Sequence, residues 1–582
     1  MKIACIGGGP AGLYLGILVK RQAPEHEVVI YERNRPDDTF GFGVVFSDAT
    51  LDHLAAADPE THAEITARFA RWDDIEVHVV AGPGGPDATS VLRSTGHGFC
   101  GLERKALLEI LQRRARALGV RIEYEHEIRA LSEVTADVIV ACDGVASWVR
   151  DALAPQIGPN VDVRPNKFVW LGCTVPYRAF TFIFKPTRFG LFRVHAYPYT
   201  ATGSTFIVEC RDETWRAAGL HEADEDRTIA ILGEIFADEL GGSALVKNRS
   251  IWRNFPTVKC ATWHAGNVVM LGDAAHTAHF SIGSGTKLAM EDSIALRDEL
   301  LAGGDIGAAL ARYEQRRRPE VHALQTAAQA SLEWFEHTER YLAMPAVQLT
   351  YSLMTRSLRV SHASMMKRDP DLARAVEQLL ADAAGGTGPA PAPTACPLVL
   401  ARLHTRGRII HAPDGISAPP NAVAHARDAA ISLVDVRDAK AVAAIRMAGS
   451  LAALRVPATR EAPERAVPDC DLVVLDPGRD PLDVELLPAT IQAVRASYPG
   501  AIAAVVRDHP VVQGHIAQLR RAGADLAWIA AHDDRATLEL SDRIRNELGF
   551  PTAVALARTP LAALDATIAA GRADLVAVPE VV

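Results

Sequence analysis

A glycine-rich turn directly after an apolar strand is the feature that most constrains how this chain folds. Residues 3–6 are apolar and form most of an expected strand at residues 2–6, and the spacing Gly7-x-Gly9-x-x-Gly12 follows them at once. This spacing predicts a strand, a tight turn and a helix, because Gly7 permits the turn and Gly12 lets the helix pack closely on the sheet. Gly9 lets the backbone approach a pyrophosphate at the amino end of that helix. Glu32 ends the next expected strand, at the spacing of a carboxylate that binds a ribose.

Two further motifs follow expected buried strands, at intervals of about 130 residues. The first is Asp143-Gly144-x-x-Ser147-x-x-Arg150, and the second is Gly272-Asp273-Ala-Ala-His276. The Asp273 carboxylate is placed to accept hydrogen bonds from a ribityl chain, although taken alone it would serve equally well as a helix cap. Gly283 and Gly285 open a helix whose free amides would stabilise negative charge on a flavin edge. Together the three motifs indicate a single bound FAD.

Size, charge and cysteine content exclude several other classes of protein. A chain of 582 residues predicts two or three domains. The net charge of −10 argues against a general nucleic-acid binder. The eight cysteines form no C-x-x-C pair, so we expect neither a metal site nor a dithiol, and we expect a cytoplasmic protein. No uncharged apolar run reaches ~18 residues, so we expect no membrane segment.

The hydrophobic pattern predicts a fold of mixed class, α/β with α+β. Alternating strands and helices predict a Rossmann-like domain, which we place at residues 1–165 and 260–383. Residues 166–259 read as an inserted antiparallel sheet, rich in aromatic and β-branched residues, that would bind the substrate. Residues 384–395 form a linker of glycine, proline and alanine. Residues 396–582 form a further α/β domain, with six strands expected between residues 430 and 578.

With these motifs, the first 380 residues resemble the class A flavoprotein monooxygenases of the para-hydroxybenzoate hydroxylase fold. The resemblance implies that the first motif binds the ADP part of FAD, the second binds FAD and a pyridine nucleotide, and the third holds the ribityl chain. Arg104, within Gly101-Leu-Glu-Arg-Lys, matches an arginine that this family places near the flavin. The set of cofactor-binding residues that we expect is Gly7, Gly9, Ala11, Gly12, Glu32, Arg33, Arg104, Asp143, Asp273, Gly283 and Gly285. Where the family often has Pro-Pro beside the flavin ring, this chain has His279-Phe280.

Shorter segments are similar to one subgroup of that family. They lie at residues 41–47, 166–172, 195–197, 204–210, 252–255 and 279–283. The subgroup contains salicylyl-CoA 5-hydroxylases, 2-aminobenzoyl-CoA monooxygenases and a tryptophan hydroxylase, and the second domain favours its CoA-ester members. The resemblance therefore implies an FAD-dependent aromatic hydroxylase that uses O2 and NADH or NADPH and converts salicylyl-CoA to 2,5-dihydroxybenzoyl-CoA (gentisyl-CoA), through a flavin C4a-hydroperoxide. Two alternatives stay open: hydroxylation of 2-aminobenzoyl-CoA or an indole such as tryptophan, and a flavin-binding structural or regulatory protein without turnover.

Four residues are candidates for positioning the aromatic ring. His279 and Phe280 follow the third motif, next to the flavin-edge loop, whereas His195 and Tyr197 share one face of an expected strand. Each of the four could instead be an ordinary core or strand residue. A CoA thioester also requires cations for its phosphates. The sources that we consider are Arg316, Arg317, Arg318, Lys367, Arg368, Arg402, Arg406 and Arg408, although runs of this kind usually face solvent.

The last domain resembles the barrels of old-yellow-enzyme type at its beginning and end. Such barrels need ~250 residues, and this region has about 187, so we expect a shortened, TIM-barrel-like domain. The places where that family holds FMN phosphate read Ala555-Leu-Ala-Arg-Thr-Pro and Val578-Pro-Glu, without the expected glycines. We therefore predict a degenerate barrel without FMN that serves as a scaffold, as a homodimer contact or as part of the CoA enclosure.

Overall fold

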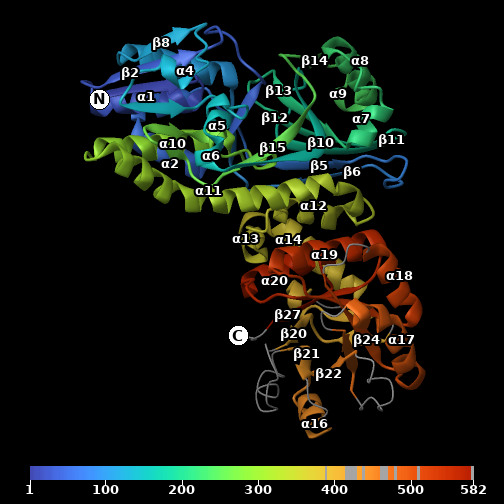
Figure 1. Ribbon diagram of the computed structural model, residues 1–582. Coiled ribbons are helices and arrows are strands. Elements are labelled where there is room, and N and C mark those ends of the chain that lie inside the picture. The colour runs from blue at the N-terminus through green and yellow to red at the C-terminus, as the bar shows by residue number, and fades with distance from the viewer. Residues whose placement is uncertain are drawn as a thin grey trace. The chain divides into compact units, whose positions relative to one another are not determined.

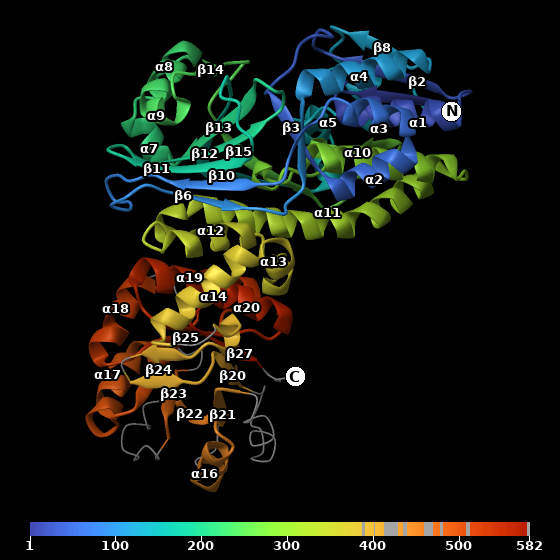
Figure 2. The ribbon, with the colours of Figure 1, turned by 180° about the vertical axis from the view of Figure 1, so that it is seen from behind.

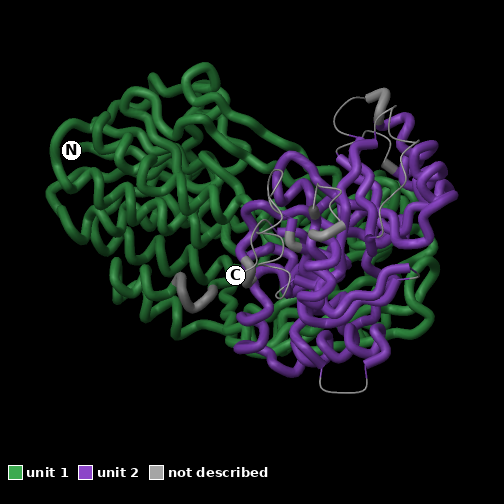
Figure 3. The backbone as a smooth tube through the Cα atoms, turned by 90° about the horizontal axis from the view of Figure 1, so that it is seen from below, with its two compact units in different colours: residues 1–339 green, residues 340–582 purple. Residues whose placement is uncertain are grey.

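A computed structural model describes residues 1–386, 390–400, 402–412, 429–434, 439–458, 470–477, 481–507 and 512–578. The chain divides into two compact units, Met1–Glu339 and Arg340–Val582, which Figure 3 distinguishes by colour. The three motifs that the sequence analysis expects to bind FAD all lie in the first unit. The domain division expected from the sequence, with its linker at residues 384–395, stays a prediction.

The first unit contains a six-stranded sheet of Rossmann-like type (Figure 1). The strand order is β16-β17-β9-β1-β2-β8, and every neighbouring pair is parallel except β16 with β17. Its strands are β1 (Lys2–Ile6), β2 (Glu27–Glu32), β8 (Arg121–Tyr124), β9 (Val138–Ala141), β16 (His264–Ala265) and β17 (Val268–Met270). The helices packed with it include α1 (Pro10–Gln22), α4 (Arg104–Ala117) and α10 (Gly285–Leu301). Parallel strands covered by helices need apolar residues on both faces, as the buried strands β1 and β9 have.

An eight-stranded sheet forms the other half of the first unit (Figure 2). Its strands are β5 (Ile75–Val79), β6 (Ser90–Ser94), β10 (Pro159–Cys173), β11 (Phe180–Thr187), β12 (Gly190–Pro198), β13 (Ser204–Cys210), β14 (Leu245–Val246) and β15 (Arg253–Cys260). The strands expected within residues 166–259 pair antiparallel with one another, and β5, from an earlier segment, joins the same sheet parallel to β11. Strands β5 and β6 come from a segment in which the sequence analysis expected no strand. They complete the sheet because β5 places its apolar residues alternately, with Ile75, Val77 and Val79 buried.

Two layers of helix cover the eight-stranded sheet. On one face lie α7 (Asp212–Ala217), α8 (Glu225–Ile235) and α9 (Ala237–Leu240). Leu232 of α8 and two residues of the adjoining connections, Leu220 and Phe236, share a core with the sheet. The long helix α11 (Ile306–Glu336) runs beneath both sheets in Figures 1 and 2. Near its beginning Tyr313 donates a hydrogen bond to Met270 O of the first sheet, 3.3 Å away. Near its end the Phe335 ring lies 5.7 Å from that of Phe182 in the second sheet.

A smaller sheet and short helices complete the first unit. Its strand order is β3-β7-β4, and it lies near the helices α2 and α3. The elements are β3 (Gly43–Ser47), β4 (Ala70–Trp72), β7 (Phe99–Glu103), α2 (Asp48–Ala57), α3 (Pro59–Thr66), α5 (Trp148–Ala152), α6 (Ala154–Ile157), η1 (Leu131–Glu133), η2 (Gly272–Ala274) and η3 (Phe280–Ile282).

The second unit begins with helices and ends with a closed parallel barrel. The helices are α12 (Ala346–Thr355), α13 (His362–Arg368) and α14 (Pro370–Ala383), and they follow η4 (Thr338–Tyr341), which spans the boundary between the units. The eight barrel strands are β20 (Ile409–His411), β21 (Ile431–Val434), β22 (Leu451–Pro457), β23 (Leu472–Asp476), β24 (Ala501–Val506), β25 (Leu526–Ile529), β26 (Thr552–Ala555) and β27 (Leu575–Val578). Other elements are η5 (Pro393–Ala395), β18 (Leu398–Leu400), β19 (Leu403–Thr405), α16 (Ala439–Met447), α17 (Pro481–Ser497), α18 (Val512–Ala522), α19 (Asp534–Leu548) and α20 (Leu561–Ala569).

The barrel has two strands that the sequence analysis did not expect, β20 and β22. The expected shortening therefore removes no strand, since eight strands close between Ile409 and Val578. Small and branched residues such as Ala453, Ala503 and Val474 fill its interior. Within the described part of the chain, no helix is both long enough and apolar enough to cross a bilayer.

The first turn predicts a difference between two glycine-to-alanine substitutions. Gly7 has φ +116°, and a Cβ there would lie 2.2 Å from the carbonyl oxygen of Cys142. We expect Gly7→Ala to lower the free energy of unfolding by about 2 kcal/mol or more, because strain and a backbone clash add. Gly233→Ala is the control: it lies within α8 with nothing near its Cβ, and should stabilise by up to about 1 kcal/mol. Urea denaturation followed by tryptophan fluorescence measures both, and equal effects would contradict this account of the turn.

Candidate active site

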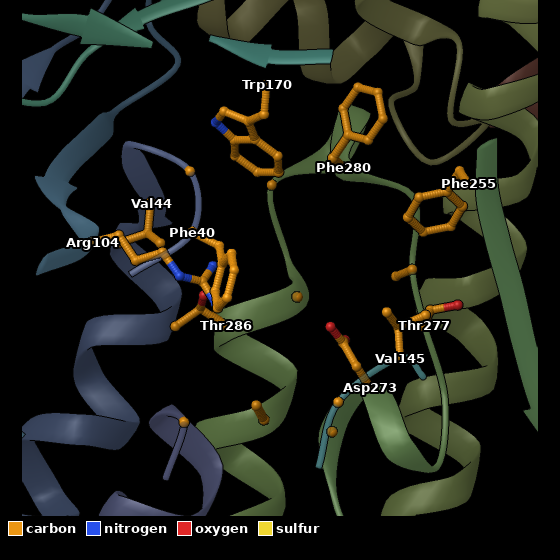
Figure 4. A pocket seen from close by; sticks show the side chains of 18 of the residues that line it. Phe40, Val44, Arg104, Val145, Trp170, Phe255, Asp273, Thr277, Phe280 and Thr286 are labelled. Carbon is orange, nitrogen blue, oxygen red and sulfur yellow. The ribbon is translucent and has the colours of Figure 1, made fainter. Parts of the chain in front are cut away.

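One cavity of about 440 Å³ lies between the glycine-rich turn and the eight-stranded sheet. Its lining residues come from the three sequence motifs, from residues 40–45 and from residues 248–256. Figure 4 shows Asp273 and Arg104 toward one end, and Trp170, Phe255 and Phe280 around the other. A polar end and an aromatic end therefore belong to one continuous space.

The glycine-rich turn forms part of the polar end. A Cβ on Gly9 would meet no atom within 4 Å, so its backbone is open to a ligand, and Gly9 and Ala11 both line the cavity. Gly12 faces inward instead: its Cβ would lie 2.4 Å from Gly7 O, so a side chain would separate helix from strand.

Glu32 lies beside this turn rather than in the cavity lining. Its Oε2 accepts a hydrogen bond from Gly8 N at 2.7 Å, and its Oε1 accepts one from Asn34 N at 2.8 Å. The carboxylate is thereby held at the carboxyl end of β2, next to the turn. The following residue, Arg33, is exposed.

Asp273 and Arg104 are charged groups of the cavity wall. Burial raises the pKa of the Asp273 carboxyl group, and the charges of His276 and Arg104 partly oppose this. Burial lowers the pKa of Arg104, against the effect of Asp273 and Tyr197. The Arg104 guanidinium has no hydrogen-bond or ion-pair partner among the residues that the structure describes, which leaves its donors for a ligand.

Asp143 contributes an unsatisfied oxygen next to the cavity. Its Oδ2 accepts from Val149 N at 3.4 Å, whereas its buried Oδ1 has no hydrogen-bond partner among the described residues. Burial raises the pKa of this carboxyl group. The residues around it, Cys142, Gly144 and Val145, line the cavity. A buried oxygen without a partner calls for a ligand or ordered water.

The beginning of α10 supplies free amides. Gly283 has a left-handed backbone with φ +64°, and Gly285 starts the helix with nothing near its Cβ. Between them, Ser284 makes no side-chain cap, and its buried Oγ has no hydrogen-bond partner within the part of the chain that the structure describes. Gly283, Ser284, Gly285 and Thr286 line the cavity, so the positive end of the helix dipole meets it.

These features fit FAD. The open backbone at Gly9, the unsatisfied Asp143 Oδ1, the Asp273 carboxylate and the amides at Gly285 are donors and acceptors for pyrophosphate, ribityl chain and ring edge. Of the expected cofactor residues, the cavity is lined by Gly9, Ala11, Arg104, Asp273, Gly283 and Gly285. The others, Gly7, Gly12, Glu32, Arg33 and Asp143, are not among its lining residues.

The other end of the cavity is an aromatic chamber. We use this name for Phe168, Trp170, Phe180, Tyr197, Phe255 and Phe280, all of which line the cavity. The Phe280 ring lies 4.9 Å from that of Phe168 and 6.3 Å from that of Trp170. Tyr197 donates a hydrogen bond to Gly43 O at 3.0 Å, and burial raises its pKa well above the ordinary value. Such a chamber holds a planar aromatic ring and excludes water.

His195 and His279 lie behind the aromatic chamber. His195 is buried, with its Nε2 3.2 Å from Glu209 Oε2, and its ring lies 5.3 Å from that of Phe280. His279 Nδ1 lies 2.9 Å from Ser281 Oγ, and its ring lies 4.1 Å from that of Phe280. The structure therefore brings all four ring-positioning candidates together, but only Tyr197 and Phe280 line the main cavity.

Glu209 is a functional candidate that the sequence analysis did not single out. It is buried, and Asn166 Nδ2 donates to its Oε1 at 2.5 Å. Burial alone would raise its pKa, but the His195 hydrogen bond and nearby positive charges hold the pKa at about 2. Its segment, residues 204–210, was noted for a resemblance only. A buried charged residue in a strand of otherwise apolar character is the signal that was available.

Comparisons with known proteins identify a matching family model and several relatives of this chain. A family model described as an FAD binding domain matches residues 130–328. The chain is 44% identical over 370 residues to salicyloyl-CoA 5-hydroxylase of a Streptomyces species, which covers 62% of this chain and 70% of that protein.

Two further relatives cover most of their own length. The chain is 36% identical to 3-hydroxy-4-methyl-anthranilyl-(aryl-carrier protein) 5-monooxygenase of Streptosporangium sibiricum, over 62% of this chain and 95% of that protein. It is 33% identical to protodeoxyviolaceinate monooxygenase of Chromobacterium violaceum, over 61% of this chain and 94% of that protein.

Among the described residues, no group of three or more His, Cys, Asp or Glu is arranged to hold a metal ion.

Glu209 predicts a pH-dependent contribution to stability. Because its pKa in the folded protein lies below the ordinary value of 4.5, its charge stabilises the fold above about pH 4.5, and this stabilisation is lost as the pH falls towards 2. We expect Glu209→Gln to destabilise by about 3 kcal/mol at pH 7, and by progressively less below pH 4.5. Urea denaturation at pH 7, 4 and 3 measures the difference from wild type. A difference that stays constant over this range would contradict the ion pair.

Proposed function

Because the chain belongs to the FAD-dependent monooxygenases, we propose that it hydroxylates the ring of an aromatic acyl-CoA, with salicylyl-CoA as substrate and 2,5-dihydroxybenzoyl-CoA as product. The observation that carries the proposal is the union of a nucleotide-binding end and an aromatic chamber in one cavity. The relative with 44% identity acts, by its name, on salicyloyl-CoA at position 5. In salicylyl-CoA that carbon lies para to the phenolic hydroxyl, where electron donation to the ring is strong.

The chain's own residues position the reactants and exclude water. Bound FAD supplies activated oxygen, with electrons from NADH or NADPH. Gly9, Asp143, Asp273 and the amides at Gly285 would hold the cofactor. The aromatic chamber would enclose the substrate ring, and closure against water protects an oxidising intermediate from wasteful decay.

Tyr197 is the residue that we propose as the acceptor for the substrate hydroxyl. Its own proton is donated to Gly43 O, so a lone pair of its Oη can accept a hydrogen bond from the substrate. A hydrogen bond accepted from the phenol increases electron donation to the ring. His195 and His279 would act behind the chamber by holding Phe280 in place.

We further propose that the barrel binds no FMN. After β26, the seventh barrel strand, Asp534 accepts hydrogen bonds from Ala557 N at 2.9 Å and from Arg558 N at 2.8 Å. TIM-barrel enzymes commonly offer backbone amides at this position to a phosphate. The Asp534 carboxylate thus occupies backbone amides that would otherwise be free to bind a phosphate. The barrel would then serve as a scaffold in a cytoplasmic enzyme, for which eight free, buried cysteines suit a reducing compartment.

The substrate is tested by product analysis. Purified enzyme with FAD, O2 and either NADH or NADPH is incubated with salicylyl-CoA, free salicylate or 2-aminobenzoyl-CoA. We expect 2,5-dihydroxybenzoyl-CoA from the first and little product from the other two. Formation of hydrogen peroxide alone with salicylyl-CoA would contradict the proposal, and product from 2-aminobenzoyl-CoA would replace it with the alternative substrate.

The aromatic chamber predicts that removing part of its wall will uncouple NAD(P)H oxidation from hydroxylation. We expect Phe280→Ala to increase several-fold the share of reducing equivalents released as hydrogen peroxide, because the ring is no longer held and water enters. Phe236→Ala controls for the loss of a buried ring, since Phe236 packs under α8 and α9 outside the cavity. Peroxide and hydroxylated product are quantified per NAD(P)H consumed. If both variants released the same share of reducing equivalents as hydrogen peroxide, Phe280 would have no specific role in enclosing the substrate ring.

A further inference from the structure

Four exposed residues form a rim on the cavity. We use this name for Phe40, Arg249, Ile251 and Arg253, each of which lines the cavity. Phe40 is 40% exposed and Ile251 58% exposed, which is unusual for large apolar side chains. Arg249 and Arg253 are exposed as well. The rim thus combines an accessible apolar surface with two guanidinium groups.

The rim adjoins the aromatic chamber through the sheet. Arg253 in β15 is paired directly with Phe168 in β10, so the two side chains lie on the same face. Ser250 Oγ donates to Trp170 O at 2.6 Å, which ties the segment before β15 to the chamber strand. Arg249 lies four residues before Arg253, a distance of at most about 14 Å along the chain.

Arg253 offers a charge that the protein itself does not use. Its side chain makes no hydrogen bond, ion pair or ring contact with any residue in the described ranges. An unpaired guanidinium has five donors, in a geometry that matches phosphate.

Arg249 is held in place by several contacts and by a strained backbone. Its guanidinium donates to Asp38 Oδ1 at 3.1 Å and lies 5.0 Å from the centre of the Phe40 ring. Asn248 Nδ2 donates to Gly41 O at 3.0 Å, so residues 38–41 are tied to the same segment. Arg249 has φ +51°, which costs energy for a residue with a side chain. Strain maintained by such contacts is characteristic of ligand sites.

We propose that the rim binds the CoA arm of the substrate, with Phe40 and Ile251 against the pantetheine chain and Arg249 and Arg253 against the phosphates. This inference rests on the proposed function, because it takes the ring to lie in the aromatic chamber and the thioester to point outward. CoA is a polyanion, and a protein of net charge −10 repels it unless cations gather where it binds.

Most of the basic residues that the sequence analysis considered for the phosphates have other partners. Arg317 is buried and donates to Asp292 Oδ1 at 2.9 Å, and Arg316 pairs with Asp298 at 3.0 Å. Arg408 is buried and donates to Asp574 O. Arg318 pairs with Glu314, and Arg402 pairs with Asp525. Internal carboxylates and carbonyls thus occupy these cations, whereas Arg253 of the rim has no such partner in the described part of the chain.

The test compares two thioesters that differ in their phosphates. Binding of salicylyl-CoA and of salicylyl-pantetheine, which has no phosphate, is measured by calorimetry on the FAD-loaded enzyme without NAD(P)H. We expect Arg249→Gln and Arg253→Gln each to weaken binding of salicylyl-CoA about tenfold, since each removes a charge-assisted hydrogen bond. Binding of salicylyl-pantetheine should change less than twofold. Arg188→Gln is the matched control, an exposed arginine over the Phe189 ring that does not line the cavity.

Each other outcome is informative. Equal weakening of both thioesters would mean that the arginines contact the acyl group, and unchanged binding of both would mean that the rim is not used; either result overturns the proposal. A second measurement needs no variant: increasing salt should weaken wild-type binding of salicylyl-CoA markedly and that of salicylyl-pantetheine little, and equal salt dependence would also overturn it. Hydroxylation of either thioester by the wild type, measured separately, tests the proposed function, so the two proposals can fail independently.

Discussion

The packing of α11 against both sheets of the first unit is the constraint on which the cavity depends. Tyr313 contacts the Rossmann-like sheet at Met270 O, and Phe335 packs on Phe182 and on His195, with ring centres 4.5 Å apart in the latter case. Between these points Gln325 Nε2 donates to Thr277 O at 2.9 Å, and Ser331 Oγ lies 2.8 Å from Ser281 Oγ. One rigid helix therefore sets both the distance between the sheets and the position of the loop that carries His279 and Phe280.

Behind the aromatic chamber, buried charged groups fix the positions of side chains more than they increase the free energy of unfolding. Glu209 is satisfied by His195 and Asn166, while Arg193, fully buried, donates to Glu339 at 2.8 Å. Buried pairs of this kind lose much of their Coulombic gain to desolvation, but removing one partner is costly. Through Asn166 and His195, the Glu209 carboxylate links β10, which carries Phe168, and β12, which carries Tyr197. An aromatic wall that cannot shift is what a coupled hydroxylation requires.

Much of the architecture could be predicted from local patterns. The expected strands at residues 2–6 and 27–32 coincide with β1 and β2, because continuous apolar runs next to a glycine turn allow few alternatives. Strands β5 and β6 were missed, since a short alternating segment joins a sheet only through partners distant in sequence. The strands β20 and β22 were missed for a related reason: each is stable only as part of the closed barrel.

The candidate site likewise has one part that local sequence predicts and another that depends on residues distant in sequence. The sequence alone determined the turn at the polar end of the cavity, since Gly7 and Gly12 are required by a backbone geometry that recurs wherever such a turn joins a strand to a helix. Only the tertiary structure decided the substrate end. Phe168 and Trp170 share one face of β10, but Arg249 precedes β15 and Arg253 lies in it, and no local pattern states that β15 pairs with β10. Their proximity follows from register and from the long helix beneath them, and these are properties of the assembled fold.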